Sequence, residues 1–166
     1  MSTVAKRQHP VNARQAEHTA AGAVLTDLII PVIQLEAHFS RAGESIAATA
    51  GQTLARWLTL EMVAEHPATV AQIAKRLGLT RQSVQRVADL LRADRLTEYA
   101  DNPAHMTSRL VRLTPRGRQT LHAIQAQQRA WSNRVGATIG EANLRQAARV
   151  VESLTNALIE DLASPR

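Results

Sequence analysis

The sequence predicts a mainly α-helical protein with one small β-hairpin. Three observations lead to this fold class. Apolar residues recur at helical spacing along most of the chain. Two short segments, each opened by a threonine that can cap a helix, lie on either side of Gly78. Two β-prone runs, Leu96–Tyr99 and Leu110–Leu113, are separated by a loop that contains an Asp-Asn-Pro turn.

Length and composition fit one globular domain with a real core. The chain has 166 residues, of which 45% are hydrophobic and 20% charged. It has no cysteine, which excludes a disulfide framework, thiolate catalysis and cysteine-based metal sites. The first twenty residues lack the apolar core of a signal peptide, and Asp27 interrupts the longest apolar stretch, Ala20–Ile33. We therefore expect a cytoplasmic protein without a membrane span.

The N-terminal part predicts an extension followed by helices. Residues 1–18 are polar and show no periodicity. Residues 19–40 have apolar positions at helical spacing, and Pro31 should bend that helix or break it. Residues 41–43 should end this helix, and a short second helix should follow near residues 44–50. Thr53 can cap a further helix, which ends before Pro67.

Residues 69–93 predict two short helices joined by a tight turn, which is a helix-turn-helix. Gly78 ends the first helix, because a left-handed backbone conformation costs least for glycine, and Leu79 should plug the turn. The caps are Thr69 and Thr80, and the helices span Val70–Leu77 and Arg81 to about Ala93. The second helix should bury Val84, Val87, Leu90 and Leu91, and should expose Arg81, Gln82, Gln85, Arg86 and Asp89.

The remaining elements complete a winged helix and add two long helices. The β-hairpin after residue 95 is the wing. Thr114 and Pro115 then open a helix with an N-cap and a proline at its first position, and Gly140 separates it from a last helix. That last helix has an aliphatic stripe, which it cannot bury alone and which we expect at a dimer interface: Leu144, Val151, Leu154 and Leu158.

The positive charge is concentrated around the helix-turn-helix. Residues 69–118 contain ten basic and four acidic side chains, which gives +6, while the rest of the chain has ten of each sign. This window indicates a polyanionic partner such as nucleic acid, although an unevenly charged surface would give the same count. Arginine supplies 18 of the 20 basic residues, a compositional bias that does not itself indicate bidentate recognition.

Four stretches match motifs of a known family. They are TVAQIAKRLGLTRQSVQRVADLL at Thr69–Leu91, DNP at Asp101–Pro103, LVRLTPRGR at Leu110–Arg118, and G-x-T-x-x-x-W at Gly51–Trp57. On these residues the chain, from about Leu25 to Leu162, resembles the MarR family of bacterial transcription regulators. The resemblance implies an obligate homodimer built by the terminal helices, with two winged-helix lobes. It also implies repression of a nearby gene and release of DNA by a small phenolic or aromatic acid.

The wing departs from the pattern of that family. Its members commonly carry a basic pair just after the position of His105. Met106 and Thr107 stand there in this chain. The wing tip therefore keeps only His105 and Arg109 for an approach to the minor groove.

These features predict a homodimeric, sequence-specific regulator of double-stranded DNA, a repressor that reads a pseudopalindromic operator. Arginine can grip guanine and glutamine can grip adenine in the major groove. The candidate base readers are Arg81, Gln82, Gln85 and Arg86, with Thr80 and Ser83 suited to phosphate or methyl contacts. The candidate phosphate contacts are Lys75, Arg76, Arg109 and Arg112. The alternatives are a winged-helix protein-interaction module and a DNA-binding protein without sequence preference.

The sequence offers one candidate effector site and little else for ligands. Trp57 either packs in the core or lines a pocket with Arg56 and His38, where an aromatic carboxylate would find a ring and cations. The six histidines never pair at helical spacing, so we expect no metal site and no cofactor. Glu61 and Glu65 lie one turn apart and are expected on a solvated face, and no catalytic motif is recognised, so we expect no enzymatic activity.

The domain layout that follows has four parts. Residues 1–18 form the extension, residues 19–44 the N-terminal dimerisation helix, residues 45–113 the winged helix-turn-helix lobe, and residues 114–166 the C-terminal dimerisation helices.

Overall fold

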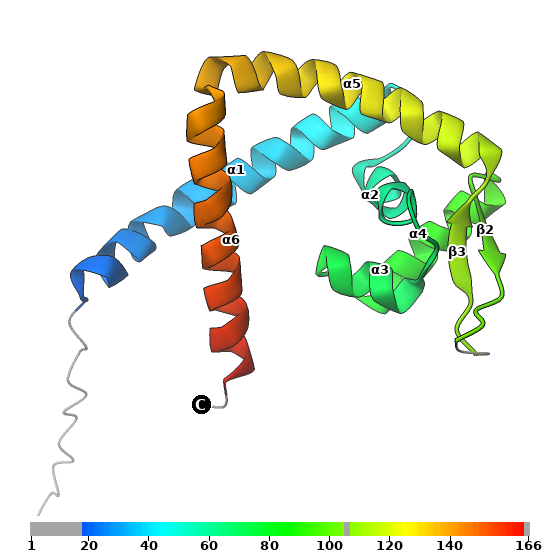
Figure 1. The fold of residues 1–166 in the computed structure, drawn as a ribbon, viewed down its shortest axis with the longest axis horizontal. Coiled ribbons are helices and arrows are strands. Elements are labelled where there is room, and N and C mark those ends of the chain that lie inside the picture. Colours follow the sequence, from blue (N-terminus) through cyan, green and yellow to red (C-terminus); the bar gives the residue numbers. More distant parts are fainter. Residues whose placement is uncertain (1–17, 105–106, 165–166) are drawn as a thin grey trace, which may run out of the picture. The chain divides into compact units, whose positions relative to one another are not determined.

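The computed structural model of the protein describes residues 18–104 and 107–164. These residues form helices and a small antiparallel sheet (Figure 1), which confirms the predicted fold class. The elements in order are α1 (Ala20–Ala48), α2 (Leu54–Met62), β1 (Ala68–Thr69), α3 (Val70–Leu77), α4 (Arg81–Ala93), β2 (Thr97–Ala100), β3 (Leu110–Leu113), α5 (Pro115–Ile139) and α6 (Glu141–Ala163). The chain divides into two compact units, and the boundary between Phe39 and Ser40 lies within α1.

Helix α1 is longer than the sequence predicts. It runs without a break through Pro31 and through residues 41–43, so the expected interruption at residues 41–43 is wrong and Pro31 does not break the helix. Proline removes one backbone hydrogen bond, but a long helix can continue on either side of it. Gly43 does not end the helix because it serves close packing: a Cβ at this position would lie 2.7 Å from Cδ1 of Leu54. Ile46 and Ala47 in the next turn are buried.

Helix α1 is also apolar enough, by length and composition, to cross a membrane. Over 18 of its residues the mean hydropathy is 1.5, so the expectation that Asp27 rules out such a stretch is wrong. None of those 18 residues is buried within the chain. The side chains concerned belong to the exposed apolar residues of the helix, which include Leu25, Ile29, Ile33 and Phe39.

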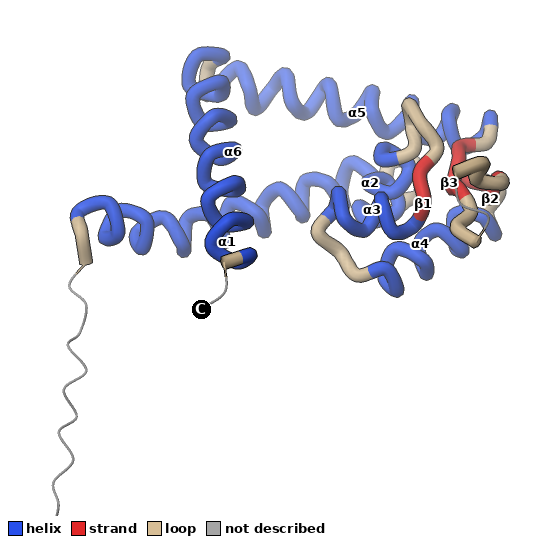
Figure 2. The backbone as a smooth tube through the Cα atoms, turned by 60° about the horizontal axis from the view of Figure 1, so that its bottom comes forward, coloured by secondary structure: helices blue, strands red, loops and turns tan. Residues whose placement is uncertain are grey.

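The sheet has one strand more than the predicted hairpin. Its order is β1-β3-β2 with both pairings antiparallel (Figure 2). Strand β1 has only two residues, Ala68 and Thr69, and pairs with Val111 and Leu110. A two-residue strand has no periodicity of its own, which explains why the sequence does not show it.

The core of the second unit is aliphatic and lies between the helices and one face of the sheet. Its largest fully buried side chains are those of Leu60, Ile73, Leu91, Leu96, Ile124, Val84 and Val111.

Thr69 closes a capping box with Gln72 at the start of α3, as the sequence predicts for its N-cap. Leu79 is 49% exposed and Leu90 is 50% exposed, so the predicted burial of both is wrong.

Helices α5 and α6 begin and end where the sequence places them. Thr114 caps α5, Pro115 is its first residue, and Gly140 separates the two helices. No residue of α6 between Glu141 and Ala163 is buried. Most helices in folded proteins are stabilised by packing of an apolar face, and the apolar residues of α6 lie largely exposed.

Candidate nucleic-acid interface

The start of α4 is set by the turn after α3. Gly78 adopts the left-handed conformation with φ of 66°, and the N–H of Leu79 donates to the carbonyl of Ala74 at 2.9 Å. This bond ends α3 in a Schellman motif. The hydroxyl of Thr80 accepts the N–H of Ser83 at 3.2 Å and lies 2.8 Å from the Ser83 hydroxyl. Thr80 and Ser83 therefore cap the helix and remain exposed at its N-terminus.

The first turns of α4 present three of the predicted base readers to solvent. Arg81, Gln82 and Arg86 are exposed. Within residues 18–104 and 107–164, their side chains form no hydrogen bond or ion pair. Long polar side chains near the N-terminus of such a helix can reach base edges in the major groove.

Gln85, the fourth predicted reader, is bound within the lobe. Its Nε2 donates to Oδ2 of Asp89 at 3.0 Å and to the Tyr99 hydroxyl oxygen at 2.7 Å. Tyr99 donates its hydroxyl proton to Oδ1 of Asp89 at 3.0 Å. Gln85 is exposed as well, but unlike the other three candidates it has partners within the chain.

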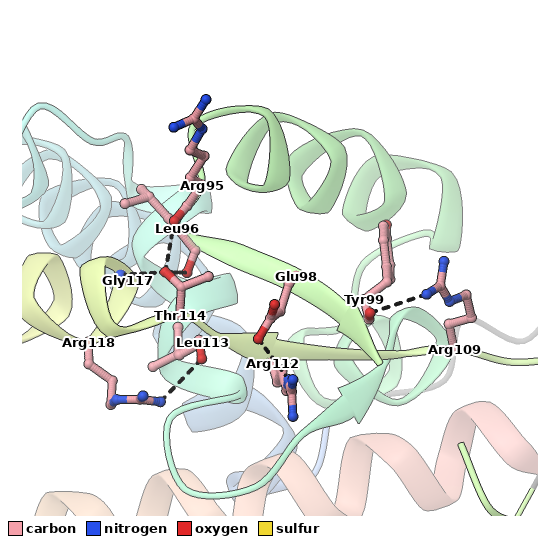
Figure 3. Close-up of polar contacts among 10 residues, drawn as sticks. All are labelled: Arg95, Leu96, Glu98, Tyr99, Arg109, Arg112, Leu113, Thr114, Gly117 and Arg118. Atoms are coloured by element: carbon pink, nitrogen blue, oxygen red, sulfur yellow. Dashed lines mark hydrogen bonds and ion pairs between the residues drawn. The ribbon is translucent and has the colours of Figure 1, made fainter. Parts of the chain in front are cut away.

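The wing is attached to α4 around the same tyrosine. The guanidinium of Arg92 lies 5.5 Å from the centre of the Tyr99 ring and that of Arg109 lies 5.7 Å from it. Arg109 also donates to the carbonyl oxygen of Tyr99 at 3.2 Å (Figure 3). Cation–π contacts of this kind orient the arginines without consuming all their donors. Of the two residues of the predicted departure, Met106 lies outside the described residues, as does His105, and Thr107 is exposed.

The remaining predicted phosphate contacts lie on two other surfaces. Lys75 and Arg76 are exposed in the last turn of α3. Arg112 pairs with Glu98 on the neighbouring strand at 2.9 Å, and both side chains are about half exposed (Figure 3). Because strand residues alternate between faces and Val111 is buried, Arg112 projects from the side of the sheet away from the core.

A tight junction fixes the sheet and the end of α4 to the start of α5. Arg95, in the turn after α4, has φ of 59°, a conformation that costs a non-glycine residue energy. The hydroxyl of Thr114 bonds to the carbonyl oxygens of Arg95 and Leu96 at 2.7 and 3.1 Å, and accepts the N–H of Gly117 at 3.0 Å (Figure 3). A Cβ on Gly117 would lie 1.9 Å from the Leu96 carbonyl oxygen, so only glycine fits there.

Of the predicted effector residues, Trp57 and Arg56 bond to other residues of the lobe, and His38 lies outside the lobe. Trp57 is buried and donates its indole N–H to Glu61 at 3.3 Å. Glu61 also accepts from Gln125 of α5 at 3.2 Å and is half-buried, so the expectation of a solvated face is wrong for this residue. Arg56 forms an ion pair with Asp94. His38 lies on α1 in the unit that ends at Phe39.

Acidic and histidine side chains form no metal-binding cluster in the described part of the chain. No group of three or more His, Asp or Glu residues there could hold a metal ion. The groups that the described parts of α4 and the wing present for binding are therefore arginine guanidiniums, glutamine amides and hydroxyl groups.

This arrangement is a winged helix-turn-helix, the fold of many DNA-binding transcription regulators. The sequence model of the MarR family matches residues 50–105. An uncharacterized protein of Mycobacterium tuberculosis is 43% identical over 122 residues, which are 74% of this chain and 85% of the relative. The crystal structure of a MarR family transcription regulator is 27% identical, covers 86% of this chain and 97% of its own, and superposes with a TM-score of 0.71.

Two structures of the protein CouR have the same fold. The CouR repressor bound to a 23-mer DNA duplex is 19% identical, covers 79% of this chain and 94% of its own, with a TM-score of 0.69. CouR from Rhodococcus jostii RHA1 bound to p-coumaroyl-CoA is 17% identical, covers 77% and 91%, with a TM-score of 0.71. The chain belongs to the MarR family of transcription regulators, a family whose members are typically not enzymes.

Three residues of the site were not predicted in the roles the structure gives them. Tyr99, Asp89 and Arg92 come from β2 and α4, and their cluster depends on how those elements pack. The sequence places Asp89 on the outer face of its helix, but shows no partner for it. The one available signal is that Asp89 follows Gln85 at i+4, a spacing that supports a side-chain hydrogen bond.

Proposed function

We propose that the protein is a homodimeric repressor that binds double-stranded DNA sequence-specifically through α4. The observation that supports this most is the outer face of α4, where Arg81, Gln82 and Arg86 project without intramolecular partners among the described residues. In a dimer, two such helices would lie about one turn of DNA apart and read a pseudopalindrome. The DNA complex of the CouR repressor supports the proposal at the level of the fold.

The experiment begins with selection of duplexes from a random pool, followed by gel-shift titration at several salt concentrations. A specific regulator should prefer its selected site over random DNA by roughly 10³-fold or more. Arg81→Ala and Arg86→Ala should each lower that preference at particular base pairs, by about 5- to 150-fold. Arg129→Ala, which removes the same charge from an exposed position on α5, is the matched control.

Two outcomes would favour the alternatives. Binding with a steep salt dependence and no preferred sequence indicates a nonspecific DNA-binding protein. Absence of DNA binding at low salt indicates a protein-interaction module.

Among the phosphate contacts we expect Arg109→Ala to weaken binding to all DNA sequences alike. Arg112→Ala should have the smaller effect on DNA affinity, because Arg112 is paired with Glu98.

The homodimer is proposed from apolar surface that one chain leaves uncovered. On α6, Leu144, Val151 and Leu158 are 40%, 57% and 54% exposed, and Leu154 is half-buried. An exposed aliphatic stripe of this kind on a helix is typical of a protein–protein interface. Sedimentation at micromolar concentration should give a dimer, and a stable folded monomer would overturn the proposal.

A matched pair of variants locates the interface on α6. Leu158→Arg places a charge in the aliphatic stripe and should shift the protein toward monomer. Asn156→Arg adds the same charge on the opposite side of the helix, two residues away, because successive residues are 100° apart. Asn156→Arg should leave the dimer intact, and equal effects of both variants would contradict the assigned face.

A second chain explains the apolar surface of α1 better than lipid does. The helix continues into Gly43, Ile46 and Ala47, which are buried in the core of the lobe, and it contains Asp27 and Glu36, which are costly in a bilayer. We therefore propose a cytoplasmic location. After lysis without detergent and ultracentrifugation the protein should remain in the supernatant; recovery in the membrane pellet that detergent releases would contradict this.

We propose further that an aromatic effector releases the DNA. The complex of CouR with p-coumaroyl-CoA supports an aromatic ligand for this fold. At Trp57 an anionic ligand would have to compete with the Glu61 carboxylate, and at Arg56 with Asp94, which favours a neutral ring next to Trp57. A tenfold loss of DNA affinity requires about 1.4 kcal/mol of preference for the non-binding arrangement.

Trp57 itself reports on that site. In a Trp131→Phe background, a bound aromatic acid or thioester should quench or shift the emission of Trp57 and release DNA over the same concentration range. Arg56→Ala should weaken the response if this side chain holds the ligand, and His38→Ala tests separately whether His38 of α1 contributes. If a panel at millimolar concentration neither changes the emission nor releases DNA, Trp57 is a core residue only.

A further inference from the structure

We propose that Gln85, Asp89 and Tyr99 form a polar bridge that fixes the wing against α4, so that Gln85 is a positioning residue and not a reader of bases. The inference rests on the proposed DNA binding for its functional meaning. The bridge itself exists without DNA and can be tested without it.

The donors of Gln85 are already used within the chain. An amide nitrogen has two hydrogens, and Nε2 of Gln85 directs them to Oδ2 of Asp89 and to the oxygen of the Tyr99 hydroxyl, at 3.0 and 2.7 Å. A bidentate contact with adenine would need one of these hydrogens for the N7 atom of the base. Gln85 can therefore read adenine only by breaking the bridge.

The bridge joins the segments whose relative position matters for DNA contact. Gln85 and Asp89 lie one turn apart on α4, Tyr99 lies on β2, and Arg109 lies just before β3 and donates to the Tyr99 carbonyl oxygen at 3.2 Å. The guanidiniums of Arg92 and Arg109 both lie over the Tyr99 ring. Tyr99 of β2 thus contacts side chains of α4 and of the residue that precedes β3.

The bridge also accounts for a carboxylate on a surface that should face phosphates. Asp89 is exposed, and its charge alone would repel the DNA backbone, so a role within the lobe explains its presence there. Both oxygens of Asp89 accept hydrogen bonds, and Arg92 is near enough to interact with its charge. The hydrogen bonds from Gln85 and Tyr99 hold the pKa of Asp89 below its ordinary value. Burial raises the pKa of Tyr99, and the bond to Asp89 raises it further.

The first test needs no DNA, because Tyr99 is the only tyrosine in the sequence. Protein labelled with ¹³Cζ-tyrosine gives one NMR signal that follows the ionisation of this phenol. Its pKa should exceed that of a free tyrosine and fall in Asp89→Asn, which removes the charge of the acceptor. Gln82→Ala, on the same helix without a contact to the ring, should leave the pKa unchanged. An ordinary pKa that Asp89→Asn does not alter would overturn the bridge.

The second test asks what Gln85 does on DNA. Tyr99→Phe keeps the ring and removes the hydroxyl, and Gln85→Ala removes the amide. If both act through the bridge, each should weaken all sequences by about three- to tenfold, and the double variant should be no worse than either single one. The preferred base at every operator position should be unchanged.

Failure of this inference and failure of the proposed function give different results. If Gln85→Ala abolishes the preference at one base pair while Tyr99→Phe changes nothing, Gln85 reads a base and the inference is wrong. If the unaltered protein selects no sequence, the proposed specific function fails, while the tyrosine titration still decides whether the bridge exists.

Discussion

Replacing Gly117 by alanine tests the packing that joins the wing to α5. Gly117 lies in the first turn of α5, where helix propensity alone predicts that alanine stabilises the protein by about 0.8–1 kcal/mol. The structure predicts the opposite sign. A Cβ at this position would meet the Leu96 carbonyl oxygen at 1.9 Å, a backbone atom that cannot move without the strand and the end of α4.

The expected cost follows from the overlap and the bonds at risk. Overpacking in a well-packed region costs about 1–3 kcal/mol. Three hydrogen bonds of 3.0–3.1 Å, from the backbone and hydroxyl of Thr114 to Leu96 and from Gly117 to Thr114, contribute about 0.5–1.5 kcal/mol each. Loss of part of this set brings the expected destabilisation to about 3–5 kcal/mol.

Urea and thermal unfolding, followed by circular dichroism, measure the effect. For a chain of this size the melting temperature should fall by roughly 6–20 °C. Gly136→Ala is the matched control, because its Cβ would lie 3.7 Å from Cδ1 of Leu144, an ordinary contact, and it should be neutral or stabilising. A Gly117→Ala variant as stable as the parent protein would refute the described junction.

Three further changes test other parts of the lobe in the same unfolding assay. Arg95→Gly should stabilise by about 0.5–1 kcal/mol, because φ of 59° suits glycine; a loss of stability would mean that the arginine side chain matters more than its backbone. Thr69→Ala should cost about 1 kcal/mol by opening the capping box with Gln72, and no change would contradict that box. The pKa of Asp89 lies below its ordinary 3.8, so the bridge stabilises the fold above about pH 4 and this contribution is lost as the pH falls further. Asp89→Asn should flatten the acid limb of the stability curve, and an unchanged limb would contradict the bridge.

Local signals predict the helix-turn-helix and the start of α5. Thr69, Gly78, Thr80, Thr114 and Pro115 act within four residues of themselves, through caps, a left-handed turn and a fixed φ. Such effects depend on neighbours in the sequence. The sequence therefore defines these helix starts without knowledge of the packing.

Contacts between distant segments could not be predicted from the sequence. Gly43 looks like a helix break in the sequence, but it admits Leu54 to the surface of α1. Glu61 looks solvated, but it bonds to Gln125, which is 64 residues away. Gln85 has no visible partner on β2 in the sequence, but it bonds to Tyr99 there. The periodicity of one segment does not show which residues of a distant segment will contact it.

The most direct test of the central claim, that two α4 helices read DNA, is methylation interference on the selected duplex. Methyl groups on guanine N7 block arginine contacts in the major groove. We expect two symmetry-related positions of interference about ten base pairs apart, with loss of interference at one symmetric pair of guanines in the Arg86→Ala or Arg81→Ala protein. Interference that is absent, asymmetric or unchanged in both variants would contradict the account.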